Sequence, residues 1–508
     1  MRPNPSSNAE KQVVEVHEEV EATPKRKKLL SLPEIGALVL SGLTSLVLIL
    51  TALTPVDNNE LERTYFREVF DQYEMLGKGI TVYPSAGAAQ YPFGTPLFVI
   101  SYDQSAPQVQ KDRVEDLFAY FVPKLHALSD RHRDYFIEEV YFENPSASFS
   151  SLVTHPVPVR EKHDRVTEGS LLPNLKMVND YLNLGELEIP YDLYQMLTIG
   201  KRMSIITNSG FNFFVGALSD FWDPQIDNSF TSDPYISDPL YDEAAATKIA
   251  SLKDKIPITE TEIEEVLKLR EENGKYFVNF SSAQASSKKE LAITFGGLAK
   301  GYANDVLEEV FLQEELTQGF LRGGFSSNVA LGRFYHPDRP WYISLGSGMV
   351  SKKKENNIYA GIIYPDCFRL SNSGGDNLGK SYLIPDPATD EIYLRHHIID
   401  VKTGAPANHK IIDVNVLSNE LSSAELDCLT TAFISLPYQE SAEIVATLKQ
   451  TLSPSGNLFA SFLTYELTSL SLDPYELLKY PIDFSLHYTS GYEAYLYEFN
   501  RIKHHLID

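Results

Sequence analysis

The spacing of apolar residues along the chain predicts both short strands and amphipathic helices. Short alternating or apolar runs indicate strands, and apolar residues that recur every three to four positions indicate helices. We expect strands at residues 95–102, 276–280, 320–322, 327–334, 341–345 and 411–417, and helices at 113–128, 191–207, from a glycine run near 297 to about 315, from 424 and from about 440. Because strands follow one another rather than strictly alternating with helices, the fold class is α+β, with a largely antiparallel sheet and packed helices.

Two stretches lack this periodicity. Residues 144–173 and 223–239 are rich in Pro, Ser, Asp and Asn. Such composition is typical of loops, so we expect both stretches to be surface insertions outside any functional site.

One long apolar run near the N-terminus predicts a membrane anchor. Residues 35–56 carry no charge, and a helix over 34–56 would cross the ~30 Å hydrocarbon layer. The basic cluster Lys25–Lys28 precedes the run, and Asp57 and Glu60 follow it, so the positive-inside rule places the N-terminus in the cytoplasm. A cleaved signal peptide is the alternative, but about 30 residues precede the run and no clear small-residue cleavage site follows it.

This anchor divides the chain into four predicted parts. Residues 1–33 are polar and charged, which is typical of a disordered cytoplasmic tail. The transmembrane helix at 34–56 is followed by a juxtamembrane segment at 57–89 and a folded domain at 90–508. We expect that domain to lie outside the cytoplasm, at a bacterial cell membrane.

Composition narrows the class of protein. With 508 residues, 43% of them hydrophobic and 22% charged, the chain is typical of a globular protein with a sizeable core. Its net charge of −25 argues against general nucleic-acid binding, which needs clustered Lys and Arg. The two cysteines, Cys367 and Cys428, are too few for a disulfide scaffold, and Cys428 has the pattern of a small buried residue.

A glycine run, residues 296–301, introduces the first candidate for chemistry. The apolar stripe that follows it predicts a helix, so the glycines enter that helix at its N-terminus. Main-chain amides and the helix dipole at such an end favour a phosphate, and Lys300 adds a positive charge. The run matches neither the P-loop nor the dinucleotide motif, and a glycine-rich turn can equally be a packing device.

A second candidate is a carboxylate and a hydroxyl one helical turn apart. Residues 422–425 read Ser-Ser-Ala-Glu, a capping box that predicts a helix beginning at Ser422. Asp427 and Thr431 then share one face and offer two hard oxygen ligands for Mg²⁺. The alternative is an ordinary solvated helix face.

A third candidate lies in the stretch His396–Asp400. His397 could accept a proton from a hydroxyl nucleophile, and Asp400 could orient it or contact the substrate. The alternative is a buried, structural pair of histidines. Residues 371–375, Ser-Asn-Ser-Gly-Gly, predict a loop whose backbone could approach a ligand closely, or an ordinary turn.

Taken together, in this order and spacing, these blocks resemble the ApbE family of FAD:protein FMN transferases. The family pattern D-L-G-G-I-A-K-G-Y-A-x-D corresponds to residues 294–305, A-G-G-D to 322–325, T-S-G to 372–374, H-I-I-D-P-x-T-G to 397–404, and A-D-A-L-A-T-A to 426–432. Weaker matches are Phe93-Gly94-Thr95 to M-G-T, and residues 209–222 to a segment that ends in Trp. The resemblance covers about residues 90–500.

The resemblance implies an ApbE-like, T-fold-like domain and a specific reaction. An acceptor Ser or Thr hydroxyl, deprotonated by His397 with Asp400 beside it, would attack FAD, take the FMN group and release AMP. Mg²⁺ would be held by Asp427, Thr431 and the main chain of Ala299. The family's motifs place FAD against Gly94, Thr95, Gly297, Ala299, Lys300, Tyr302, Gly323, Gly324, Ser373 and Gly374. The acceptor would be an exported or membrane-bound protein.

Three positions depart from the family pattern. Thr294 replaces the usual acidic residue, Phe325 replaces the Asp of A-G-G-D, and Phe93 replaces the Met of M-G-T. Two alternatives therefore stay open. One is an FAD pyrophosphatase that yields FMN and AMP, and the other is a non-catalytic, membrane-tethered flavin-binding protein on the same fold.

Overall fold

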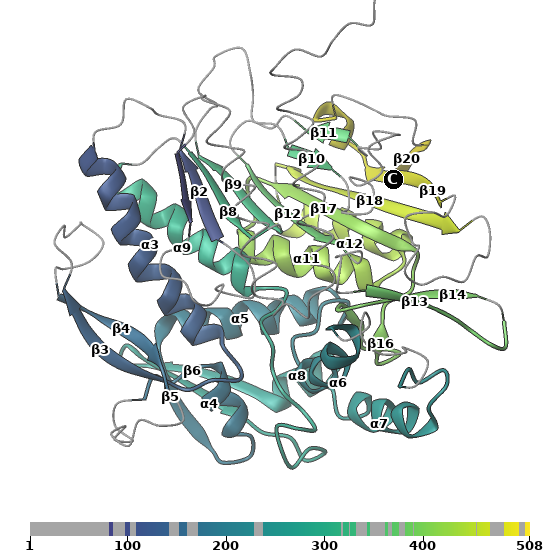
Figure 1. Cartoon of the computed structure of the whole chain (residues 1–508), viewed down its shortest axis with the longest axis horizontal. Coiled ribbons are helices and arrows are strands. Elements are labelled where there is room, and N and C mark those ends of the chain that lie inside the picture. The colour runs from purple at the N-terminus through teal and green to yellow at the C-terminus, as the bar shows by residue number, and fades with distance from the viewer. Residues whose placement is uncertain are drawn as a thin grey trace, which may run out of the picture. The chain divides into compact units, whose positions relative to one another are not determined.

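A computed structural model (Figure 1) describes residues 81–84, 97–101, 108–141, 152–159, 171–227, 237–315, 319–324, 326–331, 343–345, 361–363, 368–374, 381–389, 391–453, 455–467, 482–496 and 503–507. The predicted tail, the transmembrane helix, most of the juxtamembrane segment, and Gly94 and Thr95 lie outside these residues. Among the helices that the structure describes, none combines the length and the apolar character needed to cross a bilayer.

A nine-stranded sheet forms the frame of the domain. Its order is β1-β2-β8-β9-β12-β17-β18-β19-β20, and every neighbouring pair is antiparallel except β19 and β20. The strands are β1 Thr81–Pro84, β2 Leu97–Ser101, β8 Gly319–Gly323, β9 Ser327–Leu331, β12 Arg369–Gly374, β17 Ile411–Ser418, β18 Leu458–Leu467, β19 Ile482–Thr489 and β20 Lys503–Ile507. The α+β expectation is confirmed, and the sheet begins within the segment predicted to be juxtamembrane.

Three helices pack side by side on this sheet: α9 Ala299–Gln313, α11 Ser423–Ser435 and α12 Tyr438–Thr451. The capping box predicted for α11 is present, since Ser422 and Glu425 exchange hydrogen bonds with each other's main chain. Most of α11 is buried because α9, α12 and strands β12 and β17 all contact it. Cys428 lies fully buried within it, as expected of a small apolar residue.

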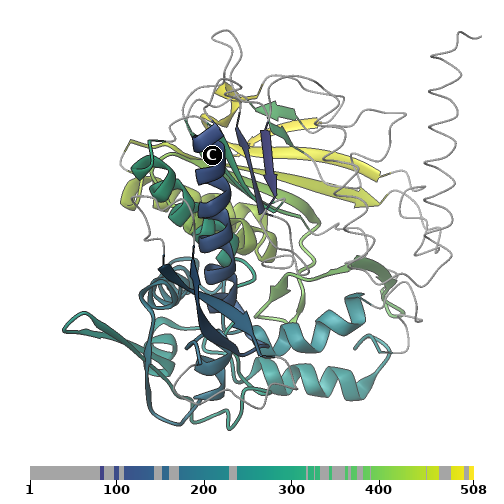
Figure 2. The same cartoon turned by 60° about the vertical axis from the view of Figure 1, so that its left-hand side comes forward.

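A second layer covers the outer side of α9 and α11, as Figures 1 and 2 show. It contains α3 Gln108–Ser129, which contacts α9, and α5 Tyr191–Ile206, which contacts α11. A three-stranded sheet of β5 Glu186–Ile189, β7 Lys275–Phe280 and β6 Leu267–Glu272 supports α5, together with α4 Leu175–Asp180 and α8 Glu260–Val266. The two helices that carry the candidate site are therefore enclosed.

A third group of elements carries the histidine block. The hairpin of β13 Ser381–Pro385 and β14 Ile392–His396 is followed by the short pair β15 Ile399–Asp400 and β16 Ala405–Pro406. Helix α6 Gly216–Asp227 contacts β13, and α7 Glu243–Lys253 packs against α6. Within the described residues, these elements pack mainly with one another and not against α9 or α11, the helix that bears Asp427.

The structure corrects both predicted insertions. Residues 144–173 include β4 Leu152–Pro158, which pairs with β3 Tyr135–Tyr141; its two prolines hid the strand, although a two-stranded edge tolerates them. Residues 223–239 include the end of α6 and the fully buried Asp238. The strand expected at 341–345 is present as β10 Ile343–Leu345, but it pairs with β11 Gly361–Ile363 outside the large sheet.

Candidate active site

The glycine run brings α9 into direct contact with α11. A Cβ added at Gly297 would lie 2.5 Å from Oγ1 of Thr431, and one at Gly301 would overlap the main-chain oxygen of Ser423. Only a residue without a side chain permits this approach. The packing role of the glycines is thus observed, and it places the N-terminus of α9 beside the proposed metal ligands.

Asp427 joins the two helices at their point of closest approach. Its Oδ2 accepts a 2.8 Å hydrogen bond from the main-chain N–H of Gly301, and its Oδ1 accepts a hydrogen bond from the hydroxyl of Ser371. The side chain is buried, and burial raises the pKa of the carboxyl, while the charge of Lys300 and the two hydrogen bonds act in the opposite direction. Asp427 is therefore not on a solvated helix face, and Lys300 lies close enough to influence it.

Strand β12 supplies two further contacts to α11. Residues 371–375 were expected to form a loop, but Ser371 to Gly374 lie in this strand and pair with β17. Side chains two apart in a strand share a face, so Ser371 and Ser373 both point to α11, where Ser373 donates a 2.9 Å hydrogen bond to Thr430. The prediction of a loop failed because the small residues are packed against a helix.

A partly buried carboxylate that the sequence did not single out fixes the start of α11. Asp305 of α9 accepts hydrogen bonds from the main-chain N–H groups of Ser423, at 2.6 Å, and Ala424, at 2.9 Å. Burial raises the pKa of Asp305 to about 7, although the two N–H groups favour its charged form. The signal was available, because Asp305 ends the motif at residues 294–305.

The two histidines of the third block differ in exposure: His396 is buried and His397 is exposed. His396 is 1% exposed and its Nδ1 accepts a hydrogen bond from the N–H of Ile398; burial lowers the pKa of His396 to about 4, so the ring is neutral. His397 is exposed at the end of β14. The structural reading therefore applies to His396, and His397 remains the residue that a substrate can reach.

Asp400 is buried in the turn that follows. Its Oδ1 accepts a 2.8 Å hydrogen bond from the N–H of Lys402, and its main-chain oxygen accepts from the N–H of Gly404. Gly404 has a φ of +75°, a conformation that favours glycine. The turn predicted after the histidines is present, and Asp400 shapes it.

The other predicted contacts are spread over α9 and the strand ends. Ala299 begins α9 and is buried. Tyr302 is buried too, and its hydroxyl donates a 3.1 Å hydrogen bond to Asp192 of α5. Gly323 ends β8 and Gly324 follows it; Gly324 has a φ of +61°, and its main-chain oxygen accepts a hydrogen bond from Arg322.

Among the three departures from the family pattern, only Thr294 lies within the described residues. Its hydroxyl accepts a long hydrogen bond, 3.4 Å, from the N–H of Gly296. Thr294 therefore accepts a hydrogen bond at the start of the glycine run, and it adds no charge there. Phe93 and Phe325 fall outside the part of the chain that the structure describes.

The donor set fits a hard divalent cation. Each oxygen of Asp427 accepts one hydrogen bond and keeps a lone pair, and the Thr431 hydroxyl lies beside the same segment. Within the described residues, no three His, Cys, Asp or Glu side chains cluster as a metal site. A cation here would therefore depend on hydroxyl, main-chain, water and phosphate oxygens, which is typical of Mg²⁺.

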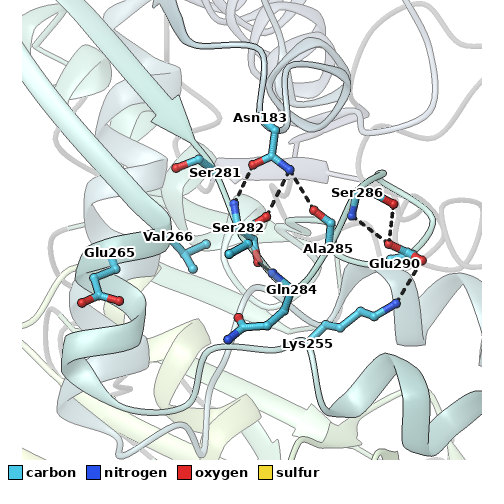
Figure 3. A pocket seen from close by; sticks show the side chains of 11 residues that line it. Asn183, Lys255, Glu265, Val266, Ser281, Ser282, Gln284, Ala285, Ser286 and Glu290 are labelled. Atoms are coloured by element: carbon cyan, nitrogen blue, oxygen red, sulfur yellow. Dashed lines mark hydrogen bonds and ion pairs between the residues drawn. The ribbon is translucent and has the colours of Figure 1, made fainter.

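A polar groove of about 740 Å³ lies away from these residues, along the loop that follows β7 (Figure 3). Its polar groups are largely satisfied by one another. Asn183 bonds to the main chain of Ser282 and Ala285, and Glu290 bonds to Ser286 and pairs with Lys255 at 3.0 Å. None of the predicted site residues lines this groove. Because its polar groups bond to one another, they stabilise the loop that follows β7.

Comparison with known proteins gives a family match over the larger part of the chain. A family model described as the ApbE family matches residues 164–453. This range contains every predicted site residue except Gly94 and Thr95. A search of the curated proteins found no match.

Solved structures with the same family name are similar to this chain. They include the ApbE protein of Thermotoga maritima (15% identity, TM-score 0.49, covering 82% of this chain and 100% of that chain). The flavin transferase ApbE of Vibrio cholerae shows 14% identity and a TM-score of 0.49, with the same coverage. The flavinyl transferase ApbE of Pseudomonas stutzeri shows 14% identity and a TM-score of 0.46 over 76% of this chain and 92% of that chain.

Proposed function

This chain belongs to the ApbE family of flavin transferase enzymes, and on that premise we propose that it transfers FMN from FAD to a Ser or Thr hydroxyl of an acceptor protein. One observation carries the proposal. The N–H of Gly301 and the carboxylate of Asp427 are 126 positions apart in sequence yet form a 2.8 Å hydrogen bond. This contact supports the proposal that two of the three candidate blocks act as one site.

The proposed reaction is a displacement at phosphorus. The acceptor oxygen forms a bond to the FMN-side phosphorus of the FAD pyrophosphate, and the bond from that phosphorus to the bridging oxygen breaks. AMP leaves, and the hydroxyl proton passes to a base. Phosphoryl transfer needs correct positioning and stabilisation of the charge on the phosphoryl oxygens.

The chain offers groups for each of these needs. Lys300 and the positive end of the α9 dipole suit the phosphates, because both favour an anion at this helix terminus, although the N–H groups of Ala299, Gly301 and Tyr302 already have acceptors within the chain. The exposed His397 is suited to accept the hydroxyl proton, whereas the buried His396 is not. Gly323, Gly324 and Gly374 would leave room for FAD at the strand ends, whereas Gly297 and Ser373, whose side-chain positions face α11, would contact FAD through the main chain.

Mg²⁺ would be held by Asp427, Thr431 and the main-chain oxygen of Ala299. When bound, it would supply Lewis-acid polarisation of the phosphoryl oxygens and neutralise their charge. The burial of Asp427 supports this assignment, because a buried carboxylate is costly even with two hydrogen bonds, and a cation would offset part of that cost.

The acceptor is proposed to be an exported or membrane-bound protein, reached from the outer face of a bacterial membrane. The apolar run at 34–56 and the basic cluster before it support this location. Protease protection of the N-terminal tail in intact cells, with accessibility of residues beyond 89, is the expected result. Cleavage of the chain near residue 56 during export would contradict the anchor.

The test of the function is a transfer assay with FAD, Mg²⁺ and an acceptor domain from an exported flavoprotein. We expect the acceptor mass to rise by one FMN group, with an equal amount of AMP released. Free FMN with an unmodified acceptor would instead identify an FAD pyrophosphatase. FAD binding without turnover would identify a flavin-binding protein.

A further inference from the structure

A buried ion pair stands behind the exposed histidine. Asp238 is fully buried and Arg395 is 4% exposed, and two hydrogen bonds of 2.9 and 3.1 Å join the guanidinium to the two carboxylate oxygens. Arg395 lies two residues before His397, while Asp238 is 157 positions away from Arg395 in sequence. A two-point contact of this kind fixes direction as well as distance.

The same carboxylate holds both strands of the hairpin. Tyr382 of β13 lies directly opposite Arg395 of β14, and its hydroxyl donates a 2.9 Å hydrogen bond to Oδ2 of Asp238. Three residues further along the same turn, Tyr241 donates a 2.7 Å hydrogen bond to the main-chain oxygen of Pro385. The turn around Asp238 thus forms hydrogen bonds with both strands of the hairpin.

Trp222 of α6 extends the contact past the histidines. The guanidinium carbon of Arg395 lies 5.5 Å from the centre of the Trp222 ring, within the range of a cation–π interaction. The indole N–H of Trp222 donates a 3.0 Å hydrogen bond to the main-chain oxygen of Gly404, in the turn shaped by Asp400. Arg395 and Trp222 therefore secure the chain before His397 and after Asp400.

We propose that Asp238 and Arg395 form a positioning pair, which sets the place of His397 and of the Asp400 turn relative to the phosphate-binding helices. The inference rests on the proposed role of His397 as the base. Neither residue of the pair needs to contact the substrate, because both are enclosed. Their effect reaches the reaction through the end of β14, where His396 is buried and His397 is exposed.

The test compares two Arg→Lys substitutions in the full chain. Arg395→Lys keeps the charge but loses the planar, two-point contact and the stacking on Trp222. Arg270→Lys is the matched control, because Arg270 also makes two hydrogen bonds to a carboxylate, that of Glu186, and lies over an aromatic ring, that of Phe277 at 4.1 Å. The control site is on the exposed three-stranded sheet.

For Arg395→Lys we expect kcat for FMN transfer to fall about 10- to 100-fold, because small displacements of a reacting group are costly. The KM for FAD should stay within about twofold, since the proposed FAD contacts lie on other elements. Removal of His397 in this background should cost much less than in the unaltered chain, because the two residues act as a unit. Arg270→Lys should match the unaltered chain in all three respects.

Hydrogen exchange separates this inference from the proposed function. Faster amide exchange should be confined to residues 381–407 and 237–242, with α9 and α11 unchanged. If this local change in exchange occurs in a protein that transfers no FMN at all, the role of the Asp238–Arg395 pair in holding the hairpin is retained and the proposed function is rejected. Unchanged exchange with an unchanged kcat would overturn the inference, and so would faster exchange spread over the whole domain.

If Arg395→Lys does not fold, the double variant Asp238→Asn with Arg395→Met removes both buried charges and so avoids an unpaired one. It should fold and still show the loss in kcat together with local exchange at 381–407. A double variant with the kcat of the unaltered chain would overturn the inference.

Discussion

The proposed site has two halves, which are held in different ways. In the half formed by α9 and α11, glycines, a helix cap and a main-chain hydrogen bond to Asp427 join elements through the backbone itself. In the half that carries His397, a hairpin is held by side chains that are distant in sequence, chiefly Asp238 of a turn and Trp222 of α6. The first half is fixed by close backbone contact, and the second by long-range polar bonds in addition to its buried apolar residues.

This difference predicts that the two halves differ in how easily a substitution can change their position. Backbone contacts between packed helices leave few alternative positions, since protein interiors are densely packed. A hairpin whose position depends in part on a buried ion pair can shift if that pair is altered. We therefore expect changes in the first half to affect both stability and chemistry, and changes at the exposed His397 or at the ion pair that supports it to affect mainly chemistry.

The largest expected effect is that of Asp427→Ala. Loss of the carboxylate removes the proposed metal ligand and the acceptor for the Gly301 N–H, so metal-dependent turnover should fall at least about 10²- to 10³-fold. Steady-state rates at several Mg²⁺ concentrations measure it. The exposed Asp220 provides the control, because Asp220→Ala should leave turnover unchanged. Wild-type turnover by Asp427→Ala would make the metal assignment wrong.

The next effect tests the histidine half. His397→Ala should lower kcat about 10²- to 10⁴-fold, the usual contribution of a general base. Fluorescence titration should still show FAD binding, and the unfolding midpoint should change little, because the side chain is exposed. His396→Ala offers the opposite pattern: it leaves the buried N–H of Ile398 without its acceptor and should mainly lower stability. If the two variants behave alike, the division between the histidines is wrong.

A smaller effect is expected where the helices touch. Gly301→Ala would place a methyl group against the main chain of Ser423, which cannot move away as a flexible side chain would, and should cost about 1–3 kcal/mol of unfolding free energy. Gly296→Ala is the neighbouring control, since its added Cβ would meet only Thr294, at 3.7 Å. Urea unfolding compares the two. Equal stability of both variants would show that close approach at Gly301 is not required.

The last expected effect is on the pH dependence of stability. Burial raises the pKa of Asp305 to about 7 in the folded protein, whereas an unfolded Asp titrates near pH ~4. Between these values the folded state binds a proton that the unfolded state releases, so this group's contribution makes stability fall as pH rises, by at most about 1.4 kcal/mol per pH unit. Asp305→Asn should remove that slope between pH 5 and 7, as urea unfolding at several pH values would show. An unchanged slope would contradict the assignment.

The sequence predicted the first half well because its signals are local. The capping box at Ser422 and the apolar stripe after the glycine run set α11 and α9, and helical spacing put Asp427 and Thr431 on one face. These features depend on residues a few positions apart. The order of the predicted elements, with strands grouped next to one another, also predicted the largely antiparallel sheet.

The second half was only partly predictable, because its supports are remote in sequence. Asp238 lies in a stretch whose composition resembles a surface loop, and nothing in that stretch identifies Arg395 as its partner. Ser371 was likewise assigned to a loop, although pairing with β17 places it in a strand. Burial of a charged residue follows from tertiary contacts, and composition alone does not report it.

The carboxylate of Asp427 has a further consequence for how the enzyme would acquire its cation. Its two hydrogen bonds come from different layers, the first turn of α9 and the strand β12, so its orientation is set before any ion arrives. Little rearrangement of the chain would then accompany loading or release. A chelator should abolish the activity of such an enzyme without unfolding it. Adding the ion back should restore activity faster than refolding would allow.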